Sequence, residues 1–236
     1  MIQIGLLGAQ GRMGEWVDQL ILSEYASKAQ VTARVSQGED LTPLLNTQVV
    51  IDFSSPQAIC ALAELALQRK NKLPAFVIGS TGISAEQNRV FEKLSQLTLV
   101  LAATNFSTGV MALSEILKQA SPMLKKLGYS PVIVETHHVH KKDAPSGTAI
   151  SLKLAIAPQD PGMIPTHSVR GGEIIGDHEV TFYGKGDHLT LGHFAQDRSI
   201  FARGAIDVAL WLGKKSGTGR LQIGDYFSDY IKEQYL

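Results

Sequence analysis

The segment with the highest density of reactive side chains is ETHHVHKKDAPSGTAISL, residues 135–152. It holds three histidines, two lysines and an aspartate, followed by Pro-Ser-Gly-Thr and an apolar run. Histidine has an unperturbed pKa near ~6.5 and readily donates or accepts a proton. A lysine beside it supplies fixed positive charge that stabilises a developing anion. This combination predicts an active site that protonates a small anion.

The residues after the histidines predict an anion pocket. Gly147 permits close backbone contact, and Thr148 is a candidate cap for the apolar helix that follows. A helix N-terminus with a hydroxyl and free N–H groups binds carboxylates. Lys141 adds charge from the preceding loop, and His137 or His138 brings the proton donor. We therefore expect a small anionic substrate here.

A metal site and a solvated strand end are the alternatives for this segment. On an extended strand His138 and His140 share a face and form a chelating pair. However, Lys141 and Lys142 repel a dication, and no Cys or Glu stands at a familiar zinc spacing, so we expect no metal. A solvated strand end does not explain the Pro-Ser-Gly-Thr that follows.

A second group of residues, in GLLGAQGRMGEW (residues 5–16), predicts phosphate binding. Gly8, Gly11 and Gly14 lie between a buried strand and a helix, where small residues let a pyrophosphate approach the free N–H groups. Gln10 stands where the standard fingerprint has its second glycine, so a tight turn without a ligand is the alternative. The surrounding pattern favours a dinucleotide.

That pattern is an alternation of short apolar strands and helices from residue 1 to about 106. It predicts an α/β fold, a Rossmann-like doubly wound parallel sheet that binds ligands at its carboxyl edge. After residue 107 the pattern changes to a second α+β domain with a mixed sheet. We expect residues 1–107 plus 199–236 to form the dinucleotide-binding domain, the final segment being helical, and residues 108–198 to form the substrate-binding domain.

The choice of nicotinamide cofactor stays open at this point. The end of the second strand, where NAD enzymes place an acid for the ribose, carries Ser36 and Gln37, and Glu39 comes later. Arg34 either attracts a 2′-phosphate or is a solvated strand residue. These features favour NADPH slightly and leave NADH possible.

Composition excludes several classes of function. The formal net charge is zero, which argues against a nucleic-acid or anionic-membrane binder. No apolar run approaches the ~18–20 residues of a membrane span. Cys60 is the only cysteine, which fits a reducing cytoplasm.

Seven motifs together resemble one family, dihydrodipicolinate reductase (4-hydroxy-tetrahydrodipicolinate reductase) of lysine and diaminopimelate biosynthesis. The most specific of them is ETHHVHKKDAPSGTA, and the resemblance covers nearly the whole chain. The motifs are GAQGRMG (8–14), IDFSSP (51–56), VIGSTG (77–82), ATNFSTGV (103–110), ETHHVHKKDAPSGTA (135–149), RGGEIIGDHEVTF (170–182) and FARGAIDVALWL (201–212).

The resemblance implies reduction of a cyclic dicarboxylate to tetrahydrodipicolinate with NADPH or NADH by a homotetramer. It also implies that residues 108–198 are the oligomerisation domain as well as the substrate-binding domain. It implies that His137 is the proton donor, that Lys141 assists it, and that His138, Gly147 and Thr148 bind substrate. Cofactor-binding positions implied in the same way are Gly8, Ala9, Gln10, Gly11, Arg12, Met13, Gly79, Ser80, Thr81, Ala103, Thr104, Asn105 and Phe106. The chain is shorter than many family members, mostly between residues 40 and 47, and lacks the family's acid directly after the second strand.

Two competing functions remain, a non-catalytic dinucleotide sensor and a reductase of another small imino or keto acid. Several side chains also have two interpretations. Arg170 either reaches a carboxylate or lies on a surface turn, and Glu135 either orients a histidine or is solvated. Asp143 stabilises a turn or pairs with a lysine. The other histidines are expected to be ordinary sheet residues: His167, His178, His188 and His193.

Overall fold

The computed structural model describes residues 1–235. The chain divides into two compact units. Unit 1 comprises Met1–Phe106 and the segment from Ser199 onward, and unit 2 comprises Ser107–Arg198. Each unit has its own sheet and its own core.

Unit 1 is built on a six-stranded sheet in the order β10-β5-β4-β3-β1-β2, and every pairing is parallel. The central β3 and β4 are buried at every position, as expected for strands covered on both faces, whereas edge strand β2 alternates buried and exposed residues. The strands are β1 (Ile2–Leu7), β2 (Ala29–Val35), β3 (Val49–Asp52), β4 (Ala75–Ile78), β5 (Leu99–Ala102) and β10 (Gly219–Leu221). The prediction of a Rossmann-like sheet is confirmed.

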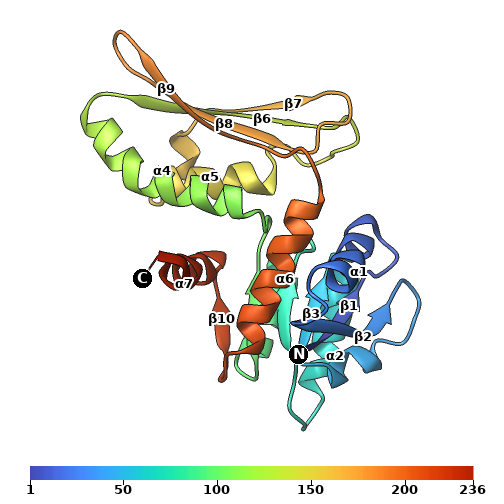
Figure 1. The fold of residues 1–236 in the computed structure, drawn as a ribbon. Coiled ribbons are helices and arrows are strands. Elements are labelled where there is room, and N and C mark those ends of the chain that lie inside the picture. Colours follow the sequence, from blue (N-terminus) through green and yellow to red (C-terminus); the bar gives the residue numbers. More distant parts are fainter. Residues whose placement is uncertain (236) are drawn as a thin grey trace. The chain divides into compact units, whose positions relative to one another are not determined.

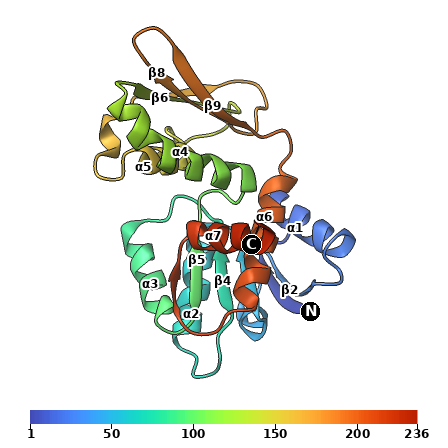
Figure 2. The ribbon, with the colours of Figure 1, turned by 60° about the vertical axis from the view of Figure 1, so that its left-hand side comes forward.

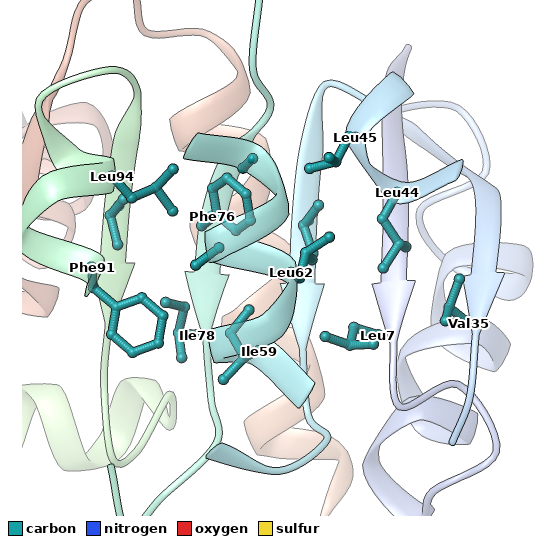
Figure 3. Close-up of a cluster of buried hydrophobic side chains, with 14 of the residues drawn as sticks. Leu7, Val35, Leu44, Leu45, Ile59, Leu62, Phe76, Ile78, Phe91 and Leu94 are labelled. Carbon is teal, nitrogen blue, oxygen red and sulfur yellow. The ribbon is translucent and has the colours of Figure 1, made fainter. Parts of the chain in front are cut away.

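Helices cover both faces of this sheet (Figures 1 and 2). On one face α2 (Pro56–Leu67) and α3 (Ala85–Ser95) pack over a core that includes Leu62, Phe76 and Phe91 (Figure 3). On the other face α1 (Arg12–Ser23) packs against α6 (Ser199–Gly213), which also contacts β3 and β4. The layers bury the strands and leave their carboxyl ends to the loops.

Two connections of unit 1 differ from the expected pattern. The sequence interpretation gave only helix after residue 199, and it was wrong in omitting β10, which precedes α7 (Ile223–Tyr235). This strand has only three residues, Gly219–Leu221, too few to show a period. Between β2 and β3 the chain crosses by a short 3-10 helix, η1 (Thr42–Asn46). The shortened segment noted in the sequence leaves room for nothing longer.

Unit 2 contains a four-stranded mixed sheet in the order β7-β6-β8-β9. Strand β6 pairs with β7 in parallel and with β8 antiparallel, and β8 pairs antiparallel with β9, which confirms the predicted mixed sheet. The strands are β6 (Ser130–His137), β7 (Thr166–Arg170), β8 (Asp177–Tyr183) and β9 (His188–Phe194). Helices α4 (Thr108–Lys126) and α5 (Gly147–Ile156) lie on one face, with η2 (Pro161–Met163) after α5 (Figure 1).

The two faces of this second sheet differ in character. Ile133, Val180 and Phe182 point toward α4 and α5 and form the core of unit 2. The opposite face carries alternate residues of the same strands, and Tyr183 and Phe194 are about half exposed on it. None of the helices within residues 1–235 is both long and apolar enough to cross a membrane.

Candidate active site

The first group of predicted site residues lies at the carboxyl ends of the parallel strands of unit 1. Gly8 follows β1 with a φ of +86°, and a Cβ there would lie 2.7 Å from the Phe53 carbonyl oxygen. Gly14 is equally constrained, because its Cβ would lie 2.2 Å from the Gly8 carbonyl oxygen. The turn therefore keeps a close approach between backbone segments that only glycine permits. It leads directly into the N-terminus of α1, whose first residues are Arg12 and Met13.

The other predicted cofactor segments follow β4 and β5 at the same edge of the sheet. Gly79 packs against Phe53, since a Cβ would lie 2.4 Å from a ring carbon of Phe53. The rings of Phe53 and Phe106 meet edge to face, with centroids 6.0 Å apart. The structure thus places all three expected segments at one edge, and these segments are 8–13, 79–81 and 103–106.

A buried carboxylate that the sequence interpretation left without a role holds these loops. Asp52 ends β3 and is fully buried. Its Oδ1 accepts hydrogen bonds from the Ser54 backbone N–H at 2.9 Å and the Ser54 hydroxyl at 2.5 Å, and its Oδ2 accepts one from the Ser80 N–H at 3.3 Å. Burial raises the pKa of Asp52, and the bonds from Ser54 and Ser80 oppose that shift. Asp52 thereby ties the end of β3 to the loop after β4.

Beside the glycine turn lies a pocket of about 740 Å³ that is lined by Gly8, Gln10, Gly11 and the loop after β2. Glu39 lines this pocket and folds back on the loop, accepting a 2.6 Å hydrogen bond from the Ser36 N–H. The Ser36 hydroxyl in turn accepts a hydrogen bond from the Gln10 N–H at 3.2 Å. The carboxylate of Glu39 therefore lies in the pocket, although strand β2 itself does not end in an acidic residue.

Arg34 does not serve this pocket. Its guanidinium binds both carboxylate oxygens of Asp18 on α1, at 2.9 and 2.5 Å. This salt bridge occupies the side chain on the exposed surface of β2. The structure gives no support to the suggestion that Arg34 attracts a 2′-phosphate, because Asp18 inside unit 1 pairs with its charge.

The second group of predicted residues surrounds the end of β6 in unit 2. Glu135 and His137 lie two residues apart on the inward face of this strand, as its alternation requires, and both are buried. The His137 Nδ1 lies against Glu135 Oε2. Arg170, at the end of β7, binds both oxygens of the same carboxylate, at 3.1 and 2.8 Å. Arg170 is thus not a solvated arginine on a surface turn, and the carboxylate that it contacts is the protein's own Glu135.

These contacts set the charge of each group. Burial alone would raise the pKa of Glu135, but hydrogen bonds from Arg170, Ser168 and His137 outweigh it and lower that pKa to about 2. Glu135 is therefore ionised and can only accept, so Nδ1 of His137 is the donor. Burial lowers the pKa of His137 below its ordinary value; Glu135 opposes this shift, whereas the charges of Lys141 and Arg170 add to it.

The loop after His137 is anchored by the same arginine. Arg170 donates to the carbonyl oxygens of Lys141 at 3.3 Å and Asp143 at 2.6 Å. The Lys141 ammonium group pairs with the Asp143 carboxylate at 2.8 Å, as one interpretation of Asp143 expected. Strand β6 ends at His137, so His138 and His140 lie beyond the strand, with ring centroids 6.1 Å apart. In the described part of the chain no group of three or more His, Cys, Asp or Glu residues is placed to hold a metal ion.

Helix α5 begins beside this cluster at the predicted residues Gly147 and Thr148. Its N-cap is Ser146, whose hydroxyl accepts the Ala149 N–H at 3.2 Å, so the expectation that Thr148 caps the helix is wrong. Thr148 is instead buried in the first turn. The Ser146 N–H donates to Glu135 Oε1 at 3.3 Å. The N-terminus of α5 is thus joined to the carboxylate that holds His137.

Two family models match the chain, one described as the N-terminus of dihydrodipicolinate reductase over residues 2–106 and one as its C-terminus over residues 109–226. The chain belongs to the dihydrodipicolinate reductase family. The arrangement of Glu135, His137 and Arg170 can therefore be interpreted in terms of the reaction of this reductase family. The resemblance inferred from the seven motifs is confirmed.

Named relatives agree with this assignment to the reductase family. The chain is 38% identical to 4-hydroxy-tetrahydrodipicolinate reductase of Sulfurimonas denitrificans over 95% of this chain and 98% of that protein. It is 39% identical to the protein of the same name in Caulobacter vibrioides, over 94% and 96% of the two chains. A solved structure described as dipicolinate-bound dihydrodipicolinate reductase from Paenisporosarcina sp. TG-14 has the same fold, with a TM-score of 0.72 at 22% identity over 94% and 97%.

Two histidines of unit 2 make contacts that the sequence interpretation missed. His178 and His193 were expected to be ordinary sheet residues, but each is hydrogen-bonded to the N-cap serine of a helix. In contrast, His167 and His188 are exposed, as expected. The alternation of DHEVTFY already places His178 on the same face as the core residues Val180 and Phe182, and this was the available signal.

Proposed function

We propose that this chain catalyses the NAD(P)H-dependent reduction of 4-hydroxy-tetrahydrodipicolinate to tetrahydrodipicolinate in lysine and diaminopimelate biosynthesis. Membership of the family and relatives at 38–39% identity support the reaction. The observation that carries the catalytic assignment is the buried array in which Arg170 and His137 share the carboxylate of Glu135.

The residues of unit 1 fit a nicotinamide dinucleotide. The glycine turn has no Cβ where backbone segments approach one another, and it opens onto a helix N-terminus and a pocket of about 740 Å³. When bound, the reduced nicotinamide supplies a hydride to the substrate. We assign the pyrophosphate to residues 8–13 and the nicotinamide end to residues 79–81 and 103–106.

His137 is the proposed proton donor, and the geometry selects which of its nitrogens reacts. Nδ1 is committed to Glu135, so Nε2 is the atom left for the substrate. Gly176 lies against this edge, since a Cβ on it would stand 3.0 Å from Nε2. The absence of a side chain at Gly176 keeps room beside the reacting nitrogen.

The lowered pKa of His137 is compatible with an acid role because the substrate carries two carboxylates. Their negative charge opposes the burial and the positive charges that lower the pKa, so substrate binding promotes protonation of His137. We propose that Lys141 stabilises the anion formed during reduction. Gly147 and Thr148 at the start of α5 bind one carboxylate, and His138 contacts the ring.

The test of this function compares His137→Gln with His140→Gln, a nearby exposed histidine that serves as the matched control. With enzymatically generated substrate, His137→Gln is expected to lower kcat by about 10²–10⁴-fold, while NADH binding measured by fluorescence stays within about twofold. His140→Gln keeps wild-type turnover. Full turnover by His137→Gln would refute the acid assignment.

The same assay separates the two competing functions. A wild-type protein that binds NADH but never oxidises it, with any acceptor tried, is a sensor. If NADH is oxidised with another imino or keto acid and not with 4-hydroxy-tetrahydrodipicolinate, the chain is a reductase of a different substrate, and the proposed roles of the site residues still apply. We also infer that the chain binds dipicolinate, a planar ring with two carboxylates, which provides an equilibrium probe of the substrate site.

The position of Glu39 favours NADH over NADPH, against the slight preference taken from the sequence. Its carboxylate lines the pocket beside Ser36 and repels a 2′-phosphate while accepting hydroxyl groups of an unmodified ribose. Glu39→Gln is expected to raise the ratio of kcat/KM for NADPH to that for NADH about tenfold. The control is Asp40→Asn, whose carboxylate accepts the Thr42 N–H at 2.9 Å. An unchanged ratio in Glu39→Gln would refute the assignment.

We infer further that the enzyme is a homotetramer assembled through the uncovered face of the sheet in unit 2. Phe194 and Tyr183, on strands β9 and β8, are about half exposed there, which is unusual for large aromatic side chains on a strand face. A cytoplasmic location stays a prediction from the single cysteine of the sequence.

A further inference from the structure

Two helices of unit 2 begin with the same arrangement of a serine and a histidine. Ser146 caps α5, and its hydroxyl lies 3.1 Å from His178 Nε2. Ser107 caps α4, and its hydroxyl lies 3.0 Å from His193 Nε2. The two histidines are directly opposite each other on the antiparallel strands β8 and β9. The sheet thus holds the start of each helix through one imidazole.

Burial keeps His178 neutral. The Ser146 hydroxyl accepts the Ala149 N–H and also contacts Nε2 of His178, to which a hydroxyl can donate or from which it can accept. Burial and the charge of His137 lower the pKa of His178 to about 3, although Glu135 opposes the shift. The side chain is only 2% exposed.

His178 also lies against the proposed proton donor. Its ring meets that of His137 edge to face, with centroids 5.1 Å apart and an interplanar angle of 80°. Ser146 is held from two sides, because its hydroxyl contacts His178 and its N–H donates to Glu135. His178 therefore touches the donor directly and contacts the start of α5 through Ser146. His193 makes the corresponding serine contact at α4 and packs against Gly109.

We propose that His178 is a positioning residue, which fixes the anion-binding start of α5 relative to the Nε2 edge of His137. The proposal rests on the proposed function, since it assigns the substrate carboxylate to Gly147 and Thr148. A neutral imidazole suits this position because a cation there would compete with His137 for Glu135. A group of fixed geometry between donor and anion site keeps the ring of the substrate aligned with the proton that it receives.

The test is a set of three variants that separates positioning from general stability. His178→Phe removes the contact with Ser146, His178→Gln places an amide near the position of Nε2, and His193→Phe is the matched control at the start of α4. Dipicolinate affinity is measured by calorimetry with NADH present, kcat and KM with substrate, and stability by urea unfolding.

His178→Phe is expected to raise KM and the dipicolinate Kd by about tenfold or more, with NADH affinity unchanged. In His178→Gln, KM and the dipicolinate Kd are expected to lie within about threefold of the wild-type values. His193→Phe loses stability to a similar extent, with KM and dipicolinate Kd within about threefold of wild type. If His178→Phe does not fold, His178→Asn, whose side chain is too short to reach Ser146, replaces it in the same comparison.

Two outcomes overturn the proposal. One is an unchanged KM and dipicolinate Kd in His178→Phe, and the other is an equal change in His193→Phe. Both are distinguishable from failure of the proposed function, because that failure appears in the wild-type protein as NADH that is never oxidised in the presence of the substrate.

Discussion

Replacing Glu135 by Gln tests the protonation of His137 most directly. Glu135 is fully buried, and its negative charge favours the protonated form of the histidine. The substitution removes that charge and leaves the guanidinium of Arg170 nearby, so both effects lower the pKa of His137. Because donation requires the protonated imidazole, the fall of kcat/KM on the alkaline side moves to lower pH.

The magnitude follows from the strength of the contact. An adjacent opposite charge shifts a pKa by about 1–3 units. Arg170 binds both oxygens of Glu135 and neutralises part of its field, so we take the lower half of this range, about 1–2 units. Above the pKa, each unit lowers the protonated fraction tenfold. At pH 8 the variant is expected to be about 10- to 100-fold slower than wild type, with a smaller difference in acid.

The assay is the pH dependence of kcat/KM at saturating NADH. The control variant is Glu179→Gln, which removes the same charge from β8 at a position pointing to the opposite face of the sheet. Its profile should coincide with that of the wild type. A Glu135→Gln profile lowered by one factor at every pH, or a break that moves to higher pH, would refute the reasoning.

Four further outcomes follow from the geometry. Arg170→Ala breaks a buried ion pair and is expected to lower the free energy of unfolding by about 3 kcal/mol, measured in urea. Gly14→Ala, which on helix propensity alone would stabilise α1, is expected to weaken NADH binding in a fluorescence titration, because its Cβ meets the Gly8 carbonyl oxygen at 2.2 Å. The unfolded state protonates His178 more readily than the folded state, so the free energy of unfolding falls as the pH drops from about 6.5 toward 3. At pH 4.5 the part of this fall that comes from His178 is about 2–3 kcal/mol. Urea titrations at pH 6.5 and pH 4.5 should show that His178→Gln removes it. Phe194→Glu is expected to reduce the mass in light scattering below that of a tetramer.

The sequence predicted the elements that repeat and missed those that are short. Alternation of apolar strands and helices was enough for the parallel sheet of unit 1, and the change of pattern after residue 107 was enough for a mixed sheet. Strand β10 has three residues, too few for a hydrophobic period, so no local sequence pattern predicts it. It forms because β5 offers a free edge, which is a property of the assembled sheet.

The candidate site shows the same limit in its side chains. The sequence suggested that Glu135 either orients a histidine or is solvated, but only the pairing of β6 with β7 brings Arg170 to the carboxylate. The carboxylate in the cofactor pocket was equally hidden, because Glu39 reaches it by folding back onto the Ser36 N–H. A contact between distant segments decides the first case, and a local turn of the backbone decides the second.

Burial and charge make three neighbouring groups of unit 2 differ in how readily they change protonation state. Glu135 stays anionic because Arg170, Ser168 and His137 donate to it, and His178 stays neutral because it is buried beside positive charge. His137 lies between them, and its pKa is lowered by burial but raised by Glu135. It is thus the group of the three whose charge an incoming dianion can change. A proton donor that is protonated when the substrate binds requires neighbours whose own charges stay constant on binding. Glu135, which stays anionic, and His178, which stays neutral, meet that requirement.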